Sequence, residues 1–260
     1  MLDPIQDLAI PFDFYRVNHD LSADLSDLER LIKNLHVLMV VVIHYFGFPQ
    51  AETDRIKRIC SAHGVYLLED CAHCIHTLGT TSGLGSKGDF SLYSMHKTLP
   101  VPDGGILRIN NPTVSVPPLD LQDSIASESL TVILNANIDQ VSSARISNYK
   151  LLLGLLPSSP EYDFLCPNLA PGVVPLNFPL FIRRRDRFWV YKALLDVEIQ
   201  TTALYYELVS AISKTLFPVS HSVSRKILNL PTHQDLTQDD LVKMAATFMS
   251  LLSRAPMASV

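Results

Sequence analysis

Two carboxylates end an apolar run in the first third of the chain. Glu69 and Asp70 close the segment VYLLED, and polar groups at the carboxyl end of a strand lie where open α/β sheets bind ligands. A helix-capping role is about equally favoured for an isolated Glu-Asp pair. His73 follows Asp70 by about one helical turn, so the two side chains can face one ligand. A histidine buried and hydrogen-bonded in the interior is the alternative.

A lysine follows the next predicted strand. Lys97 lies in the segment GDFSLYSMHKTLPVPDGG, with Ser94 and His96 before it and a Gly-Gly pair after it. This setting differs from the charged face of a solvated helix. The amine of a lysine can bind a carbonyl carbon covalently and can carry protons, so the segment favours a chemical role.

The two segments together resemble the core of the DegT/DnrJ/StrS family of pyridoxal-phosphate (PLP) sugar aminotransferases. The family pattern is a strand that ends in Glu-Asp-Ala-Ala-His/Gln, a Gly-Ser-x-Gly-Asp turn and an internal lysine. The corresponding residues here are Glu69-Asp70-Cys71-Ala72-His73, Gly85-Ser86-Lys87-Gly88-Asp89 and Lys97. The resemblance continues from about residue 9 to residue 252, through HYFGFPQ (residues 44–50), FPLFIRRRD and the last predicted helices.

The resemblance implies a role for each of these side chains. Asp70 would pair with the pyridine nitrogen of PLP and keep it protonated, and His73 would lie against the ring or its 3-oxygen. Lys97 would hold the cofactor covalently and then act as the acid/base at the substrate's Cα. Ser94 and His96 form an S-x-H-K arrangement that also looks like the lysine loop of cysteine desulfurases, where Ser and His contact the cofactor phosphate.

The implied function is a PLP-dependent aminotransferase. It would move an amino group from an amino-acid donor, with glutamate expected, to a keto sugar that is expected to be nucleotide-linked. The family forms active sites between two subunits, so the resemblance implies a homodimer. A lyase or desulfurase is suggested by the S-x-H-K arrangement alone and ranks last.

One difference from the family concerns the start of the sequence. Family members carry some tens of residues before the point that matches this chain, including a helix whose N-terminus cradles the cofactor phosphate. Helix N-termini supply backbone donors and a favourable dipole for phosphate. We therefore expect a large domain that lacks this segment, and the alternative function is a truncated or non-catalytic member that serves as a binding or regulatory subunit.

Composition excludes several other classes of protein. The chain has 260 residues, 47% of them hydrophobic, and a net charge of -5, so it offers no basic surface for nucleic acid. Its longest apolar run, Val37 to Ile43, is shorter than the roughly 20 residues of a membrane helix. The acidic start MLDPIQDLAI differs from a secretion signal. We expect a cytoplasmic protein with no membrane or nucleic-acid partner.

The four cysteines are too few and too irregularly spaced for a disulfide framework. They stand at positions 60, 71, 74 and 166, and we expect reduced thiols. Cys71-x-x-Cys74 with His73 and His76 resembles half of a zinc site, but no further ligands stand at a suitable spacing. No metal site is predicted.

The elements that must position these residues form an α/β pattern in the first half of the chain. Short apolar strands alternate with amphipathic helices, which predicts a mostly parallel sheet sandwiched by helices, like the large domain of fold type I PLP enzymes. The predicted strands are Ala9–Tyr15, Val37–Tyr45, Val65–Asp70, Phe90–Ser94 and Gly105–Ile109, and helices are predicted at Asp24–Lys33 and from about Ala51.

The second half predicts a different unit. Residues 110–142 are rich in Pro and Ser and predict a surface excursion, and a connecting helix is predicted at Asp139–Leu153. We place a PLP-binding domain at residues 1–140, and the connecting helix with a small C-terminal α+β domain at residues 141–260. Further predicted elements are a strand at Leu176–Ile182, a helix at Arg185–Leu195, a segment at Glu198–Leu204 and a helix at Gln238–Leu252 capped by Thr237.

Overall fold

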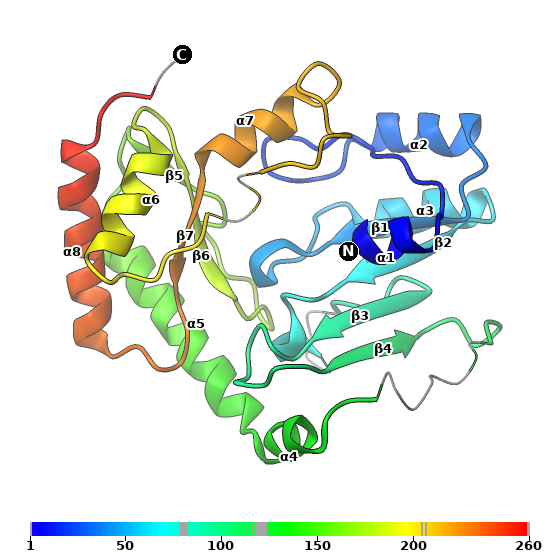
Figure 1. The fold of residues 1–260 in the computed structure, drawn as a ribbon, viewed down its shortest axis with the longest axis horizontal. Helices are drawn as coiled ribbons and strands as arrows, with labels where there is room; N and C mark the ends of the chain where they lie inside the picture. Colours follow the sequence, from blue (N-terminus) through cyan, green and yellow to red (C-terminus); the bar gives the residue numbers. More distant parts are fainter. Residues whose placement is uncertain are drawn as a thin grey trace.

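The computed structural model places two sheets in two lobes joined by a long helix (Figure 1). It describes residues 2–78, 83–115, 117, 124–203, 205 and 207–258. The first lobe holds a four-stranded sheet and the second a three-stranded one. The domain boundary near residue 140 stays a prediction.

The first sheet carries the residues singled out by the sequence. Its strands are β1 (Met39–Ile43), β2 (Tyr66–Asp70), β3 (Phe90–Ser94) and β4 (Gly105–Ile109), in the order β1-β2-β3-β4. The first two pairings are parallel and the third is antiparallel. The predicted α/β class with a mostly parallel sheet is confirmed.

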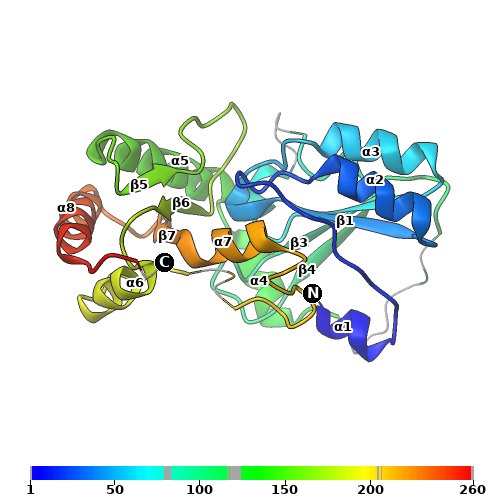
Figure 2. The same ribbon diagram turned by 90° about the horizontal axis from the view of Figure 1, so that it is seen from above.

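Two helices cover one face of this sheet. Figure 2 shows α2 (Leu25–Asn34) and α3 (Thr53–Ala62) together on that face. Their apolar stripes close a core that includes Leu28, Ile56 and the β1 residue Val42. The side chain of Asp24 caps α2 by accepting the N–H groups of residues 26 and 27.

The opposite face of the sheet is largely open, which differs from the sandwich expected for parallel strands. Helix α1 (Leu2–Asp7) lies on this side in Figure 2. Large apolar side chains of the face nevertheless remain at least 36% exposed, and they are Met39, Tyr66, Leu92, Leu107 and Ile109. Among the described residues, this face is thus covered less than the face under α2 and α3.

The predicted strand Ala9–Tyr15 is wrong. Ala9 has a left-handed backbone (φ 52°), and the residues up to Arg16 join no ladder. Near them stands one isolated bridge, between Val17 and Ala23. A strand needs a neighbour to take its backbone hydrogen bonds, and no described strand pairs with residues 9–15.

The excursion predicted for residues 110–142 is partly wrong. It contains α4 (Ser127–Asn135), and the connecting helix α5 (Ile138–Leu155) starts at nearly the predicted residue. The α4 sequence has only a weak apolar stripe, which explains why periodicity did not indicate it. Residues 116 and 118–123 lie outside the described part of the chain.

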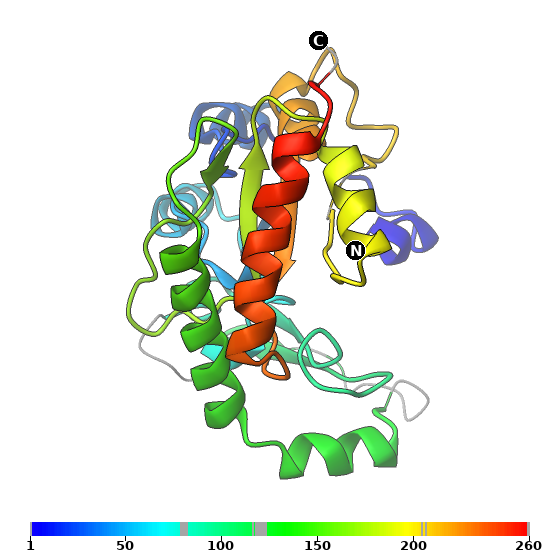
Figure 3. The same cartoon turned by 90° about the vertical axis from the view of Figure 1, so that its left-hand side faces the viewer.

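The second lobe is a three-stranded antiparallel sheet with helices against it (Figure 3). Helices α5 and α8 run along one side of the sheet and share its apolar core. Thr237 forms a reciprocal capping box with Asp240 at the start of α8. The elements are β5 (Tyr162–Phe164), β6 (Asn177–Ile182), β7 (Ile227–Pro231), α6 (Arg187–Asp196), α7 (Pro218–Lys226) and α8 (Gln238–Arg254).

The sequence identified β6, α6 and α8 but gave no separate signal for β5, β7 or α7. Its segment Glu198–Leu204 is irregular where described, with a single bridge from Thr202 to Asn229. Leu204 itself lies outside the described residues. Within the described part of the chain, no helix combines the length and the apolarity needed to cross a bilayer.

A glycine allows the two lobes to meet next to the end of β1. Gly47 has φ +93°, and a Cβ there would stand 2.7 Å from the backbone nitrogen of Leu176. The N–H of Leu176 donates to the carbonyl of Phe46 at 2.8 Å, and Phe46 is fully buried in the core of the second lobe. The segment after β1 is therefore shared by both lobes.

Candidate active site

The carboxyl ends of three strands meet at one edge of the first sheet. Ile43 is in register with Asp70, and Asp70 with Leu92. Side chains alternate along a strand, so Asp70 points to the same open face as Tyr66, and Ser94 to the same face as Leu92. The parallel arrangement thus gathers the predicted residues at this edge.

Asp70 is a buried carboxylate with one described hydrogen bond. It is 9% exposed, and its Oδ1 accepts the N–H of Ala72 at 2.9 Å. Burial raises its pKa, although this N–H and the charge of Lys97 act in the opposite direction. A carboxylate that is short of donors is suited to a cationic partner.

His73 has a defined tautomer. The N–H of Phe46 donates to its Nδ1 at 3.1 Å, so the ring proton is on Nε2. The Phe46 ring stacks on it with 6.1 Å between centroids. Burial, together with the charge of Lys97, lowers the pKa of His73 to about 4, and the ring is a neutral donor at neutral pH.

Lys97 lies just beyond β3 and is exposed. No hydrogen bond or ion pair of its amine is found among the described residues, and its charge lowers the pKa of both Asp70 and His73. Ser94 Oγ lies 3.0 Å from Nδ1 of the exposed His96. The structure therefore brings Asp70, His73 and Lys97 into one electrostatic environment, with the Ser94–His96 pair on the same loop.

Glu69 has a structural role that sequence analysis did not assign. It is fully buried, and its carboxylate accepts the N–H groups of Gly85, Lys87 and Gly88 at 3.1, 2.7 and 2.6 Å. Burial alone would raise its pKa, but these bonds and that of His44 outweigh burial and lower it. The carboxylate thus fixes the Gly-Ser-x-Gly-Asp turn.

His44 connects this network to the end of β1. Its Nε2 lies 2.9 Å from Glu69 Oε2, and its Nδ1 accepts the N–H of Gln50 at 2.9 Å. A nitrogen that accepts a hydrogen bond carries no proton, so Nε2 donates to Glu69. The backbone N–H of His44 also donates to the carbonyl of Asp70 at 3.0 Å. The HYFGFPQ motif singled out this segment in the sequence. Only the tertiary structure shows that its histidine contacts Glu69 and Asp70.

Two tyrosines extend the site toward the second lobe. The Tyr45 and Tyr205 rings meet edge to face with centroids 5.5 Å apart, and Tyr205 also lies 6.4 Å from Phe46. These contacts pack Tyr205 against the segment that follows β1. Tyr206 lies outside the described residues.

The described residues contain no group of three or more His, Cys, Asp or Glu side chains that could hold a metal ion. All four cysteines are thiols. Cys71 and Cys74 are fully buried and belong to a hydrophobic core cluster. The half zinc site suggested by Cys71-x-x-Cys74 therefore gains no further ligands from the described part of the fold.

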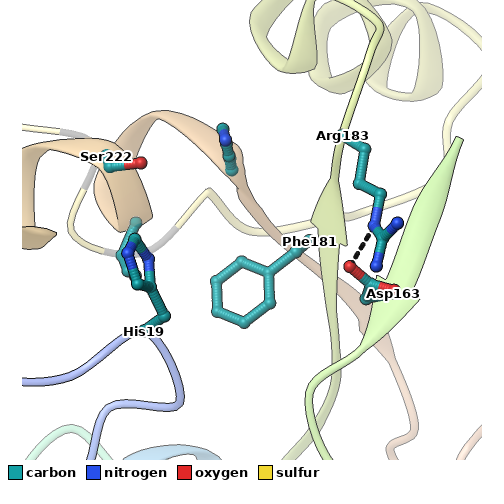
Figure 4. Close-up of a pocket in the computed structure, with 7 residues that line it drawn as sticks. His19, Asp163, Phe181, Arg183 and Ser222 are labelled. Carbon is teal, nitrogen blue, oxygen red and sulfur yellow. Dashed lines mark hydrogen bonds and ion pairs between the residues drawn. The ribbon is translucent and has the colours of Figure 1, made fainter.

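A separate cavity of about 430 Å³ lies between the lobes (Figure 4). It contains none of the predicted site residues, and its lining is His19, Asp163, Phe181, Arg183, Ser222, Val223 and Lys226. Arg183 belongs to the basic run at the end of β6 and pairs with Asp163, as Figure 4 shows. The pair leaves this arginine largely neutralised, as expected for a solvated strand end.

Comparison with known proteins identifies the first half of the chain. Residues 14–117 match the DegT/DnrJ/EryC1/StrS aminotransferase family. The match covers 104 of the 260 residues. The matched range contains Asp70, His73, Ser94 and Lys97.

Individual relatives are distant. GDP-perosamine synthase of Vibrio cholerae is 24% identical over 90% of this chain and 71% of its own length. UDP-N-acetyl-3-dehydro-alpha-D-glucosamine 3-aminotransferase of Acidithiobacillus ferrooxidans is 21% identical over 82% of this chain and 64% of its own. The solved structure of Helicobacter pylori PseC, an aminotransferase of pseudoaminic acid biosynthesis, has a TM-score of 0.76 at 16% identity, with 97% of this chain and 76% of that chain covered. The fold is that of sugar aminotransferases.

Replacing Gly85 should damage the turn held by Glu69. Gly85 has φ +74°, and a Cβ would stand 2.8 Å from the Tyr93 ring and 3.1 Å from the Cys71 sulfur. Gly64 has φ +68° with nothing near its Cβ position, so it is a matched control. We expect Gly64→Ala to cost roughly 1–2 kcal/mol of unfolding free energy, and Gly85→Ala about 1–3 kcal/mol more. Urea unfolding measures both, and equal losses would contradict the close packing at Gly85.

The Glu69 network should contribute stability that depends on pH. Because its folded pKa is lowered from 4.5, its contribution is present above pH 4.5 and is lost as the pH falls through the folded pKa. Glu69→Gln places an amide among N–H donors and should cost at least about 1.5–3 kcal/mol at pH 7. The difference in unfolding free energy between Glu69→Gln and wild type should become smaller as the pH falls. Urea unfolding from pH 7 to pH 3 tests this, with the exposed Glu207→Gln as control, and a difference independent of pH would contradict the assignment.

Proposed function

We propose that the chain is a PLP-dependent aminotransferase subunit. It moves an amino group from an amino-acid donor, with glutamate expected, to a keto sugar. The observation that carries the proposal is the buried carboxylate of Asp70 beside the neutral donor His73 and the free amine of Lys97, within a segment of an aminotransferase family.

The residues fit the cofactor. Asp70 is buried with one described donor and has a raised pKa, so a protonated ring nitrogen would supply the positive partner that it lacks. His73 presents Nε2–H as a donor because Phe46 occupies its Nδ1. Ser94 and His96 offer a hydroxyl and an imidazole for the phosphate.

Each side chain has a distinct task. PLP, when bound, supplies the electron sink that stabilises negative charge at the substrate's Cα. Asp70 holds the proton on the ring nitrogen, and His73 orients the ring through Nε2. Lys97 would bind the cofactor through Nζ and would carry the proton of the substrate's Cα as acid and base. Lys97 can move in this way because its exposed amine is tied to no described partner.

The substrate class rests on relatives. The names GDP-perosamine synthase and UDP-N-acetyl-3-dehydro-alpha-D-glucosamine 3-aminotransferase both carry a nucleoside diphosphate, which supports a nucleotide-linked keto sugar as acceptor. A cytoplasmic homodimer, as the sequence predicts, fits the exposed apolar face next to Asp70 and Ser94. Such a role belongs to the biosynthesis of polysaccharide sugars.

A second candidate is a non-catalytic family member that acts as a binding or regulatory subunit. The open apolar face of the first sheet favours it, because exposed patches of this kind mark sites of association. The retained Asp70, His73 and Lys97 favour catalysis instead. Cofactor binding separates the two candidates.

Lys97→Ala should abolish covalent binding of PLP. The purified protein is mixed with PLP, treated with borohydride, digested and analysed by mass spectrometry. We expect the fixed pyridoxyl group on Lys97 in wild type and no pyridoxyl group on this peptide in Lys97→Ala, because Lys97 is the only lysine among the described residues whose charge acts on Asp70. Lys87→Ala is the control, since Lys87 lies on the neighbouring turn and pairs with Asp54. A wild-type protein without the adduct would favour the non-catalytic candidate.

Asp70→Asn should separate binding from catalysis. The neutral amide cannot hold the ring nitrogen protonated, so we expect PLP to remain attached to Lys97 while amino transfer from glutamate slows by roughly 100-fold or more. Rapid-mixing absorbance after addition of glutamate measures this half-reaction. The exposed Asp196→Asn serves as control, and an unchanged rate in Asp70→Asn would rule out the assigned role.

A further inference from the structure

Two cysteines lie within the segment that carries Asp70 and His73. Cys71 follows Asp70 directly and Cys74 follows His73, and both are fully buried. The N–H of Cys74 donates to the carbonyl of Cys71 at 2.8 Å. Such an i to i+3 turn keeps the two Cα atoms within about 7 Å, which overlaps the roughly 4.4–6.8 Å found in disulfides.

The two thiols differ in their surroundings. The neighbouring Cys74 thiol lowers the pKa of Cys71 to about 6, against the effect of burial. Burial raises the pKa of Cys74, and its S–H also lies 3.5 Å from the carbonyl oxygen of His44. One thiolate next to one thiol is the arrangement that disulfide formation requires.

The other cysteines lack such a neighbour. Burial raises the pKa of Cys60 to about 11 and that of Cys166 to about 12. Cys60 lies under α3 in a separate core cluster. These two thiols are therefore internal references for reactivity.

We propose that Cys71 and Cys74 are a dithiol that hydrogen peroxide oxidises reversibly to a disulfide at the edge of the active site. The Cys71 thiolate attacks a peroxide oxygen, the O–O bond breaks, and a sulfenic acid and the first water form. The Cys74 sulfur then attacks the Cys71 sulfur, the S–S bond forms, and the S–O bond breaks to release the second water. The two thiols lose two electrons and the peroxide gains them.

Oxidation changes the segment between the two sulfurs. The S–S bond removes the Cys74 S–H from the carbonyl of His44 and fixes the turn that carries His73. Since Asp70 precedes Cys71 directly, the disulfide should weaken PLP binding, a consequence that rests on the proposed function. Reduction with dithiothreitol restores the dithiol.

The experiment uses the full chain with Cys60→Ala, because one tryptic peptide, residues 59–87, contains Cys60, Cys71 and Cys74. After peroxide treatment and alkylation, we expect this peptide to lose two hydrogens and to carry no alkyl group. Adding Cys71→Ser or Cys74→Ser should prevent the loss, and Cys166 should stay alkylated. Dithiothreitol should reverse it. Alkylation of both Cys71 and Cys74 after peroxide would overturn the proposal, as would a sulfinic acid on Cys71 without a disulfide.

A second measurement separates the disulfide from the cofactor. PLP is titrated into reduced and oxidised protein, and we expect at least about tenfold weaker binding after oxidation, with recovery in dithiothreitol. Equal affinities in the two states would overturn the coupling even if the disulfide forms. Failure of the reduced protein to bind PLP would contradict the proposed function and leave the mass measurement of the disulfide standing. Circular dichroism checks that every variant is folded.

Discussion

The backbone of residues 44–47 is the constraint on which the candidate site depends. On one side, the N–H of His44 holds the carbonyl of Asp70 and the N–H of Phe46 holds Nδ1 of His73. On the other side, the carbonyl of Phe46 accepts the N–H of Leu176 from the second lobe. Phe46 is left-handed (φ 58°), and Gly47 leaves room for that approach. The packing of the lobes therefore fixes the tautomer of His73.

The neighbouring carboxylates of Glu69 and Asp70 on β2 have different surroundings and therefore different roles. Glu69 and Asp70 point to opposite faces of β2, because side chains alternate along a strand. Glu69 meets a turn full of N–H donors, which lower its pKa, whereas Asp70 has one described donor and a raised pKa. The hydrogen bonds of the Glu69 carboxylate stabilise the fold. The Asp70 carboxylate is left with capacity for a ligand.

The candidate site lies at the edge of the open apolar face of the first sheet. A polypeptide that packs on this face would therefore lie next to the site. Asp70 and Ser94 lie on the same face as Tyr66 and Leu92, which are 43% and 36% exposed. A polypeptide that covers this face would also exclude water from the edge where Asp70 lies. Water exclusion strengthens the electrostatic interactions of a buried carboxylate with a cationic partner.

The sequence alone predicted several elements and the candidate site residues, because these predictions depend on local patterns. Phe90–Ser94 and Gly105–Ile109 were predicted to the residue, and the capping residue Thr237 was identified from its local motif. Only the tertiary structure shows the features that depend on contacts between residues far apart in the sequence. Residues 9–15 form no strand because no neighbour takes their hydrogen bonds, and Glu69 became structural because a turn sixteen to nineteen residues later donates to it. Local periodicity carries no information about such partners, since backbone and side-chain hydrogen bonds are completed only when the lobes pack.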